Sequence, residues 1–319
     1  MKSGFSRKTN HMARFVSFDA PNSVGTYPVA INDNTEIAGF STDAANVSRG
    51  FVRKKNGSIA MFSVPNASST TPAAIDSKGQ VTGWYLDTSG TTGGRGFLRK
   101  ADGTNVTFDP PGSNLTMPTS INPGGVITGF YGDANGPAHG FVRKANGSFI
   151  TFNLANSSET APFGINPSGA IAGQWADMNH HLHGFLRKAN GTVATFDVLN
   201  AISTTPMVIT PAGLVMGRYT DLAGNPQCFV RQPNGAIVAI TIPNASSATA
   251  VDINPAGDIV GVWVDGTGGL HSFLRQANGS ITPLNVPNAT YTQPVGITSN
   301  SEIAGYYRDA NGVHGFIRQ

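Results

Sequence analysis

A repeat of about 44 residues runs through the chain and constrains its fold more than any other feature. The segment AHGFVRKANGSFITF at 138–152 returns as LHGFLRKANGTVATF at 182–196. One isoleucine recurs at steps of 44, 46, 44, 44, 44 and 44 residues, at Ile31, Ile75, Ile121, Ile165, Ile209, Ile253 and Ile297. This period is typical of propeller blades. The chain is therefore predicted to contain seven structural units of one kind.

Each unit reads as four short strands separated by turns. The consensus is T-x-P-x-x-I-N, then P-x-G-x-I-x-G-x-Y-x-D, then H-G-F-x-R-x-x-N-G, then x-x-x-x-F-x-x-P-N. None of these runs has a helical period. The Asn-Gly pairs after the third run favour type I′ hairpins. We predict an all-β fold, a seven-bladed β-propeller of four-stranded blades.

The two ends of the sequence complement each other. The seventh unit stops at HGFIRQ after its third strand, whereas FVSFDAPN at 15–22 is a fourth strand without the first three. Joining them in one blade removes exposed edge strands, so we predict that the N-terminal strand closes the ring. The predicted propeller spans 13–319, with repeats near 26–69, 70–115, 116–159, 160–203, 204–247, 248–291, and 292–319 plus 13–25. Residues 1–12 contain no apolar stretch and read as an expression leader.

Composition argues against several classes of partner. The formal net charge is +3, but Lys2, Arg7 and Lys8 lie in the leader, and the remainder is balanced between acidic and basic residues. Balanced charge favours neither nucleic acid nor an anionic membrane surface, and no apolar run could span a bilayer. The single cysteine, Cys228, excludes an intramolecular disulfide framework. We expect a monomer that binds no nucleic acid and inserts into no membrane.

The third run of each unit carries a recognisable triplet. It reads HGF at 139–141, 183–185 and 314–316, HSF at 271–273, and RGF at 49–51 and 95–97. These units resemble the HAF repeat, a bacterial extracellular family named after a His-Ala-Phe triplet, although Gly replaces Ala and QCF at 227–229 departs further. The resemblance covers 13–319. It implies a repeat fold and a secreted or periplasmic protein, and it implies no reaction because the family has no shared catalytic motif.

Two charged residues occur in all seven units and are therefore predicted to serve the fold. The acidic slot holds Asp43, Asp87, Asp133, Asp177, Asp221, Asp265 and Asp309. The basic slot holds Arg53, Arg99, Arg143, Arg187, Arg231, Arg275 and Arg318. We expect each aspartate to accept turn N–H groups after the second strand. We expect each arginine to bond turn carbonyls and to pack its stem between blades.

Histidines invite a metal hypothesis. His139, His183, His271 and His314 share one slot, but equivalent slots in neighbouring blades lie roughly 10 Å or more apart, too far to share an ion. The segment NHHLHG at 179–184 offers three imidazoles, and we interpret it as a solvated loop, with a surface metal as the alternative. No cofactor is predicted, and a divalent metal is left open.

Function is sought where the units differ, on the face where the loops surround the channel mouth. Gln174 and Arg218 replace apolar residues after the second-strand glycine, and Asp252 replaces a small or apolar residue on the channel-lining first strand. The candidate ligand-binding residues are Arg218, Gln174, His180, Trp175 and Tyr219. The candidate catalytic residues are Asp252, Glu159 and His181, with Glu159 expected in an inter-blade loop. Cys228 falls in the same sector.

These residues leave several functions open. Arg218 could anchor a carboxylate or phosphate, and Asp252 could act as a general base or accept hydrogen bonds from a polyol. Alternatively, Arg218 and Asp252 satisfy each other or fill gaps between blades. We predict a binding module for a small molecule, glycan or peptide at the channel mouth. The alternatives are a hydrolase or lyase at the same mouth and, more weakly, a structural scaffold of a surface protein.

Overall fold

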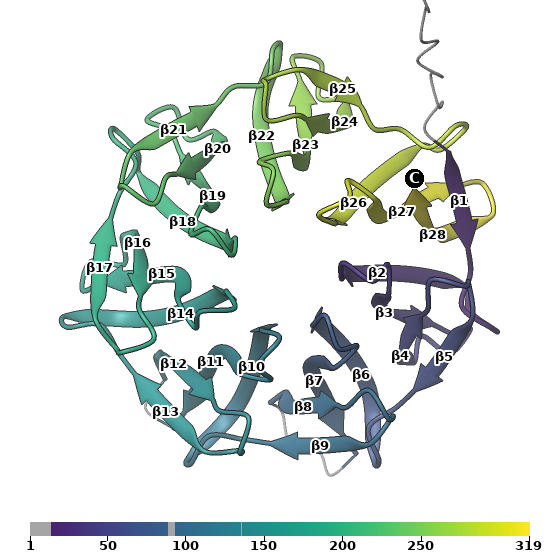
Figure 1. The fold of residues 1–319 in the computed structure, drawn as a ribbon, viewed down its shortest axis with the longest axis horizontal. Coiled ribbons are helices and arrows are strands. Elements are labelled where there is room, and N and C mark those ends of the chain that lie inside the picture. The colour runs from purple at the N-terminus through teal and green to yellow at the C-terminus, as the bar shows by residue number, and fades with distance from the viewer. Residues whose placement is uncertain (1–13, 89–92, 135) are drawn as a thin grey trace, which may run out of the picture.

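The computed structural model describes residues 14–88, 93–134 and 136–319, and these form 28 strands arranged around a central opening (Figure 1). Within this described part the secondary structure is all β, as predicted, and no helix long and apolar enough to cross a membrane is present. The strands are short because the repeat places a turn signal after every few residues.

Five sheets each contain four consecutive antiparallel strands, and the first strand of each lies nearest the centre (Figure 1). Two of them consist of β6 (Ala67–Ile75), β7 (Val81–Asp87), β8 (Arg95–Arg99) and β9 (Asn105–Phe108), and of β10 (Ser113–Ile121), β11 (Ile127–Asp133), β12 (Ala138–Arg143) and β13 (Phe149–Phe152). The next consists of β14 (Ser157–Ile165), β15 (Ile171–Asp177), β16 (Leu182–Arg187) and β17 (Val193–Phe196). The last two consist of β18 (Ser203–Ile209), β19 (Val215–Thr220), β20 (Pro226–Arg231) and β21 (Ile237–Ile240), and of β22 (Ala245–Ile253), β23 (Ile259–Asp265), β24 (Leu270–Arg275) and β25 (Ile281–Pro283).

The remaining strands come from the two ends of the described chain. One group is β2 (Gly25–Ile31), β3 (Ile37–Thr42), β4 (Ser48–Arg53) and β5 (Ile59–Phe62). The other is β26 (Tyr291–Ile297), β27 (Ile303–Asp309) and β28 (Gly312–Arg318), with β1 (Phe15–Phe18) pairing antiparallel with β28. A single parallel bridge between Gly25 and Val313 links the two groups.

Strand β1 repeats the contacts of the outermost strand in the other sheets. A Cβ added at Gly315 would lie 2.5 Å from Cζ of Phe18, and one at Gly50 would lie 2.5 Å from Cζ of Phe62 on β5. The phenylalanine ring of the outer strand thus covers the glycine of the third strand in both sheets. The glycine of the HGF triplet is required because any side chain there would displace this ring.

The repeated arginines pack between neighbouring sheets, as predicted. Arg53 lies 4.8 Å from the ring centroid of Phe18, and Arg99 lies 4.9 Å from that of Phe62. Six of the seven guanidinium groups also donate to the backbone carbonyl of the next residue, as Arg187 does to Lys188 at 3.4 Å. Burial lowers the pKa of Arg53 and Arg187. Cation–π contacts of this kind therefore join five pairs of adjacent sheets, through Arg53, Arg99, Arg143, Arg187 and Arg231.

Two turn predictions have different outcomes. The turn aspartates accept N–H groups as expected, because Oδ1 of Asp43 accepts from Ala45 and Val47 at 2.9 and 3.0 Å. The type I′ prediction is wrong, since Gly57 has a positive φ of 91° and Asn56 does not. These third-strand turns instead contain a 2.9 Å bond from Gly57 N to the carbonyl of Lys54, with one left-handed residue, as in a type I turn followed by a bulge.

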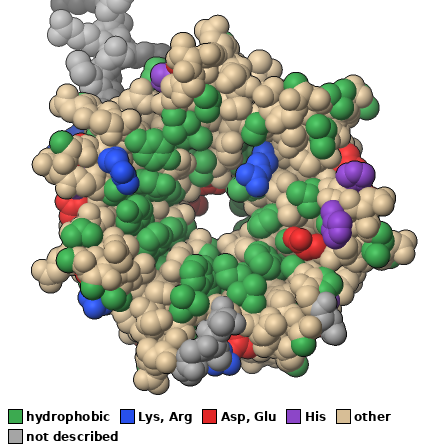
Figure 2. All heavy atoms as spheres, turned by 180° about the vertical axis from the view of Figure 1, so that it is seen from behind, with side chains coloured by type: hydrophobic (Ala, Val, Ile, Leu, Met, Phe, Trp, Pro, Cys, Tyr) green, Lys and Arg blue, Asp and Glu red, His purple; other side chains and the backbone are tan. Residues whose placement is uncertain are grey.

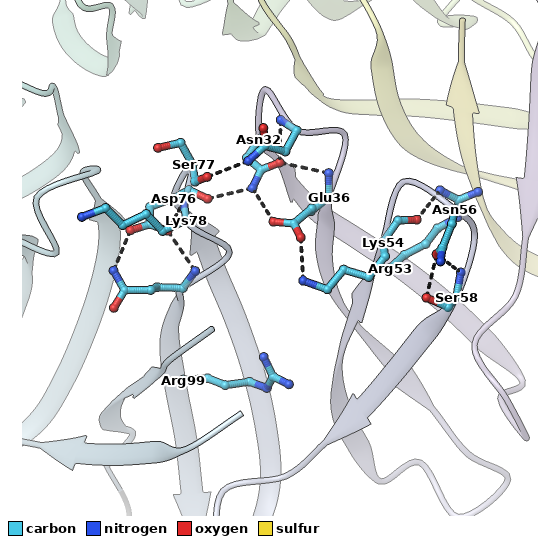
Figure 3. Close-up of polar contacts among 12 residues, drawn as sticks. Asn32, Glu36, Arg53, Lys54, Asn56, Ser58, Asp76, Ser77, Lys78 and Arg99 are labelled. Carbon is cyan, nitrogen blue, oxygen red and sulfur yellow. Dashed lines mark hydrogen bonds and ion pairs between the residues drawn. The ribbon is translucent and has the colours of Figure 1, made fainter. Parts of the chain in front are cut away.

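The loops define two faces of the molecule. The upper face carries the loops from second to third strands and from sheet to sheet, and the lower face carries the first-to-second and third-to-fourth turns. Buried asparagines link the lower-face turns of adjacent sheets, since Asn32 Nδ2 donates to the carbonyl of Asp76 at 2.7 Å (Figure 3). Asn122, Asn166 and Asn254 donate in the same way to residues 44 positions later.

Candidate functional site

The first strands enclose a cavity of about 510 Å³ along the central axis. Its walls are mainly apolar. They are formed by Val29, Ala30, Ile31, Ala73, Ala74, Trp84, Met117, Pro118, Thr119, Ser120, Phe163, Gly164, Ile165, Met207, Val208, Ile209, Val251, Asp252, Val295 and Gly296. Asp252 is the one ionisable residue among these described lining residues. Hydrophobic side chains also surround the central opening on the upper face (Figure 2).

Asp252 is placed by β22 and half-buried in the channel wall, as expected. Its Oδ1 accepts from the N–H of Ile253 and its Oδ2 from the N–H of Ile297 on β26, both at 2.9 Å. Burial raises the pKa of Asp252 to about 6, and the two N–H groups oppose this rise. Ser120 occupies the same slot and accepts from Ile165 at 3.4 Å. Asp252 therefore bridges adjacent sheets as well as facing the channel.

Arg218 on β19 is exposed and forms no hydrogen bond or ion pair with any described residue. Arg218 pairs in register with Thr205, whereas Val208, which occupies the slot of Asp252, pairs with Met216. Arg218 thus lies nearer the upper face and Asp252 nearer the lower face. The alternative that Arg218 and Asp252 satisfy each other is wrong, because they stand at different levels of the channel.

Gln174 and Cys228 are explained by local packing. Gln174 Oε1 accepts from Thr205 Oγ1 at 3.0 Å, so this side chain joins β15 to β18. Cys228 is fully buried, and its Sγ accepts from the N–H of Ala250 at 2.9 Å. It stands in the glycine slot of the triplet, opposite Ile240 instead of phenylalanine. Ile240 is smaller than phenylalanine and leaves room for the thiol. Burial raises the pKa of the Cys228 thiol to about 12.

The other acidic and histidine candidates lie away from the cavity. Glu159 is half-buried inside β14 opposite Ala176, so its predicted place in an inter-blade loop is corrected to the first strand. His180 adopts a left-handed φ of 64°, and the exposed His181 lies 3.5 Å from Asp177. The structure places no three His, Cys, Asp or Glu side chains of the described ranges together as a metal site.

Trp175 and Tyr219 face a different side of their strands from Gln174 and Arg218, because successive side chains alternate. Trp175 stacks on His183 with ring centroids 4.7 Å apart and packs against the buried cluster that contains Phe185. Burial raises the pKa of Tyr219. Neither residue lines the cavity. Both occupy a slot that is aromatic in other sheets too, at Tyr85, Tyr131, Trp263 and Tyr307.

An aromatic cluster on β2, β3, β26 and β27 was not predicted from the sequence. Tyr27 stacks on Phe40 with centroids 4.9 Å apart and meets Tyr306 edge-on at 5.6 Å. Tyr291 lies 6.0 Å from Tyr306, and burial raises its pKa to about 12. The sequence feature that could have pointed to this cluster is Tyr27. In the other units its position holds small, polar or flexible residues, at Thr71, Met117, Ala161, Thr205, Thr249 and Gln293.

Comparison with known proteins identifies the fold. Virginiamycin B lyase from Staphylococcus aureus aligns with a TM-score of 0.64 and 15% identity, covering 97% of this chain and 100% of that one. The β-propeller domain of the Trilobed protease from Pyrococcus furiosus aligns with a TM-score of 0.66 and 7% identity, covering 93% and 95%. Puromycin hydrolase aligns with a TM-score of 0.66 and 12% identity, covering 95% of this chain and 54% of the hydrolase.

These identities are too low to transfer a function. No protein-family model matches the chain, and no curated protein matches its sequence. The similarity in structure extends over nearly the whole chain, and together with the all-β sheets around a central opening it shows that the chain adopts a β-propeller fold.

Proposed function

We propose that this chain is a seven-bladed β-propeller that binds a small polar ligand, a glycan or a peptide at the channel mouth on its upper face. In this proposal β1 completes the blade of β26, β27 and β28 and closes the ring. The pairing of β1 with β28 supports closure. So do two contacts between the first and last sheets: Thr35 donates to Glu302 at 2.5 Å, and Ser299 N donates to Asp33 at 2.8 Å.

One observation carries the binding function. A mainly apolar cavity of about 510 Å³ lies along the channel, and the exposed Arg218 takes the register position of Trp84, one of the residues that line it. Sites for small ligands typically combine apolar walls with a few polar groups that set orientation. Aromatic rings provide flat contact surfaces, and a guanidinium binds carboxylate or phosphate through two parallel hydrogen bonds.

The alternative reaction is hydrolysis or elimination in the channel, and Asp252 is the observation that favours it. A carboxyl group whose pKa is raised to about 6 can exchange a proton near neutral pH, as a general acid or base must. No second ionisable group among the described lining residues accompanies it. Binding is therefore our first proposal. Export to the periplasm or cell exterior is also proposed and rests on the resemblance to HAF repeats.

The test is a panel of neutral glycans, uronate-containing glycans and short peptides, measured by thermal shift and by product formation. Ligands that raise the melting temperature of the wild-type protein should lose affinity about tenfold or more with Arg218→Ala. Arg308→Ala is the matched control, since Arg308 is an exposed arginine on β27 outside the register position that Arg218 shares with the cavity-lining Trp84. Binding that is unchanged in Arg218→Ala would refute this site. Product that forms with wild-type protein but not with Asp252→Asn would establish the enzymatic alternative.

A further inference from the structure

A second cavity lies on the lower face, between the sheet of β14–β17 and that of β18–β21. It has a volume of about 430 Å³, within the range of small-molecule sites. Its apolar walls include Leu186, Ile209 and Pro233. Its ionisable lining residues in the described chain are all cationic, at Arg187, Lys188 and Arg231.

The equivalent groove between the sheets of β2–β5 and β6–β9 has its own carboxylate (Figure 3). Glu36 accepts from Lys54 Nζ at 2.5 Å and from Asn32 Nδ2 at 2.9 Å. These bonds help to hold the pKa of Glu36 below its usual value against the effect of burial. The acid is thus integral to that groove and neutralises its lysine.

Ala170 occupies the slot of Glu36 in the second cavity, while Lys188 occupies the slot of Lys54. The lysine is kept and its acid is lost. Lys188 is exposed, and its side chain forms no hydrogen bond or ion pair within the described ranges. The change to alanine also removes the side chain that would fill the space.

The two arginines add positive charge, and no Asp or Glu of the described residues lines this cavity. Arg187 lies 4.8 Å from the ring centroid of Phe152, and Arg231 lies 4.9 Å from that of Phe196. The Nε atom of Arg231, like those of Arg53, Arg99 and Arg143, is buried and has no hydrogen-bond partner among the described residues. Guanidinium groups remain charged when buried, so the cavity favours an anion.

The combination of a free lysine and a small neighbour occurs in this groove alone among the described sheets. The slot of Glu36 holds Gln80, Val126, Ala170, Leu214, Asp258 and Glu302 in the other sheets. The slot of Lys54 holds Lys100, Lys144, Lys188, Gln232, Gln276 and Gln319. Lysine meets alanine only at Lys188 and Ala170.

We propose that this lower-face cavity binds a small carboxylate with an apolar body. The ligand's carboxylate takes the place that Glu36 occupies in the equivalent groove and pairs with Lys188. Its apolar part packs against Leu186, Ile209 and Pro233. The site lies on the opposite face from the channel mouth and does not depend on the function proposed there.

The experiment measures binding of acetate, butyrate, hexanoate and benzoate by calorimetry at constant ionic strength, with hexanamide as the neutral control. Affinity should rise with apolar area, and hexanamide should bind at least tenfold more weakly than hexanoate. Ala170→Glu supplies an internal carboxylate and should abolish binding without lowering the melting temperature. Lys188→Gln copies Gln232 of the next sheet and should weaken hexanoate about tenfold.

A gain-of-function variant keeps the test independent of damage to the fold. Glu36→Ala should open the equivalent groove, free Lys54 and raise the stoichiometry of hexanoate from one to two. Three results would overturn the proposal: no binding by the wild-type protein, equal binding by the Ala170→Glu variant, or hexanamide binding as tightly as hexanoate. An unchanged stoichiometry in a folded Glu36→Ala variant would also contradict it.

Discussion

The guanidinium of Arg53 on β4 lies 4.8 Å from the ring centroid of Phe18 on β1, so the N-terminal strand is packed against the sheet of β2–β5. The same contact joins Arg99 to Phe62, Arg143 to Phe108, Arg187 to Phe152 and Arg231 to Phe196. Phe18 therefore occupies the place of an outer-strand phenylalanine, although it comes before all other strands in the sequence.

If β1 is a full blade strand, Phe18→Ala should be as damaging as Phe62→Ala. Each change removes a ring that covers a glycine and stacks under an arginine, and each should lower the free energy of unfolding by about 3 kcal/mol. Urea unfolding of both variants provides the comparison. A loss from Phe18→Ala that is much smaller than that from Phe62→Ala would show that β1 is only loosely attached.

The exchange of glycine and phenylalanine for Cys228 and Ile240 can be reproduced in another sheet. Gly140→Cys should destabilise the protein by about 2 kcal/mol, because a Cβ at Gly140 would lie 2.7 Å from Cζ of Phe152. Adding Phe152→Ile should recover most of this loss, as the smaller side chain does opposite Cys228. Unfolding of both single variants and the double variant gives the coupling energy. Simple addition of the two losses would contradict the packing explanation.

The turn aspartates should make the protein sensitive to acid. Hydrogen bonds from the N–H groups of Asn225 and Ala223 hold the pKa of Asp221 below its ordinary value. The resulting stability is present above the ordinary pKa of an aspartate and is lost as pH falls through the lowered one. Asp221→Asn should therefore reduce the loss of melting temperature between pH 5 and pH 3. An unchanged acid response in this variant would assign acid sensitivity to other groups.

Asp252 should have the opposite effect on stability. Its pKa is raised to about 6, so the folded state binds its proton more tightly than the unfolded state does. Stability from this group increases as pH falls from about 7 to 4, by up to about 2 kcal/mol. Asp252→Asn should remove this increase, because an amide does not titrate in this range. Urea unfolding of the wild-type protein and the variant across this pH range checks the sign of the effect. A contribution of Asp252 to the free energy of unfolding that falls as the pH is lowered from 7 to 4 would contradict it.

The repeat allowed the strands and the roles of the turn aspartates and stacked arginines to be predicted, because a residue kept in every slot must serve the common fold. The departures were harder to interpret. Arg218 and Asp252 lie in neighbouring units, but the strand register separates them along the channel. Trp175 follows Gln174 directly, yet the alternation of side chains in a strand turns it toward another part of the sheet.

Compensating pairs could not be predicted from single slots. Cys228 was assigned to a functional sector because its partner Ile240 lies on another strand and is recognised only from the pairing. The inference about the lower-face cavity rests on the contact between Glu36 and Lys54 in the equivalent groove. These two residues lie on different turns of one sheet. Only this contact shows that Ala170 stands where the equivalent groove has a carboxylate bonded to its lysine.

Binding in the channel can be measured most directly through its methionine methyl groups. Met117 and Met207 line the cavity, whereas Met61 and Met178 do not. With ¹³C-labelled methionine methyls, a ligand found by thermal shift should move the resonances of Met117 and Met207 in proportion to its occupancy and leave those of Met61 and Met178 unchanged. Shifts confined to Met61 or Met178, or saturation without any change at Met117 and Met207, would show that the ligand binds elsewhere.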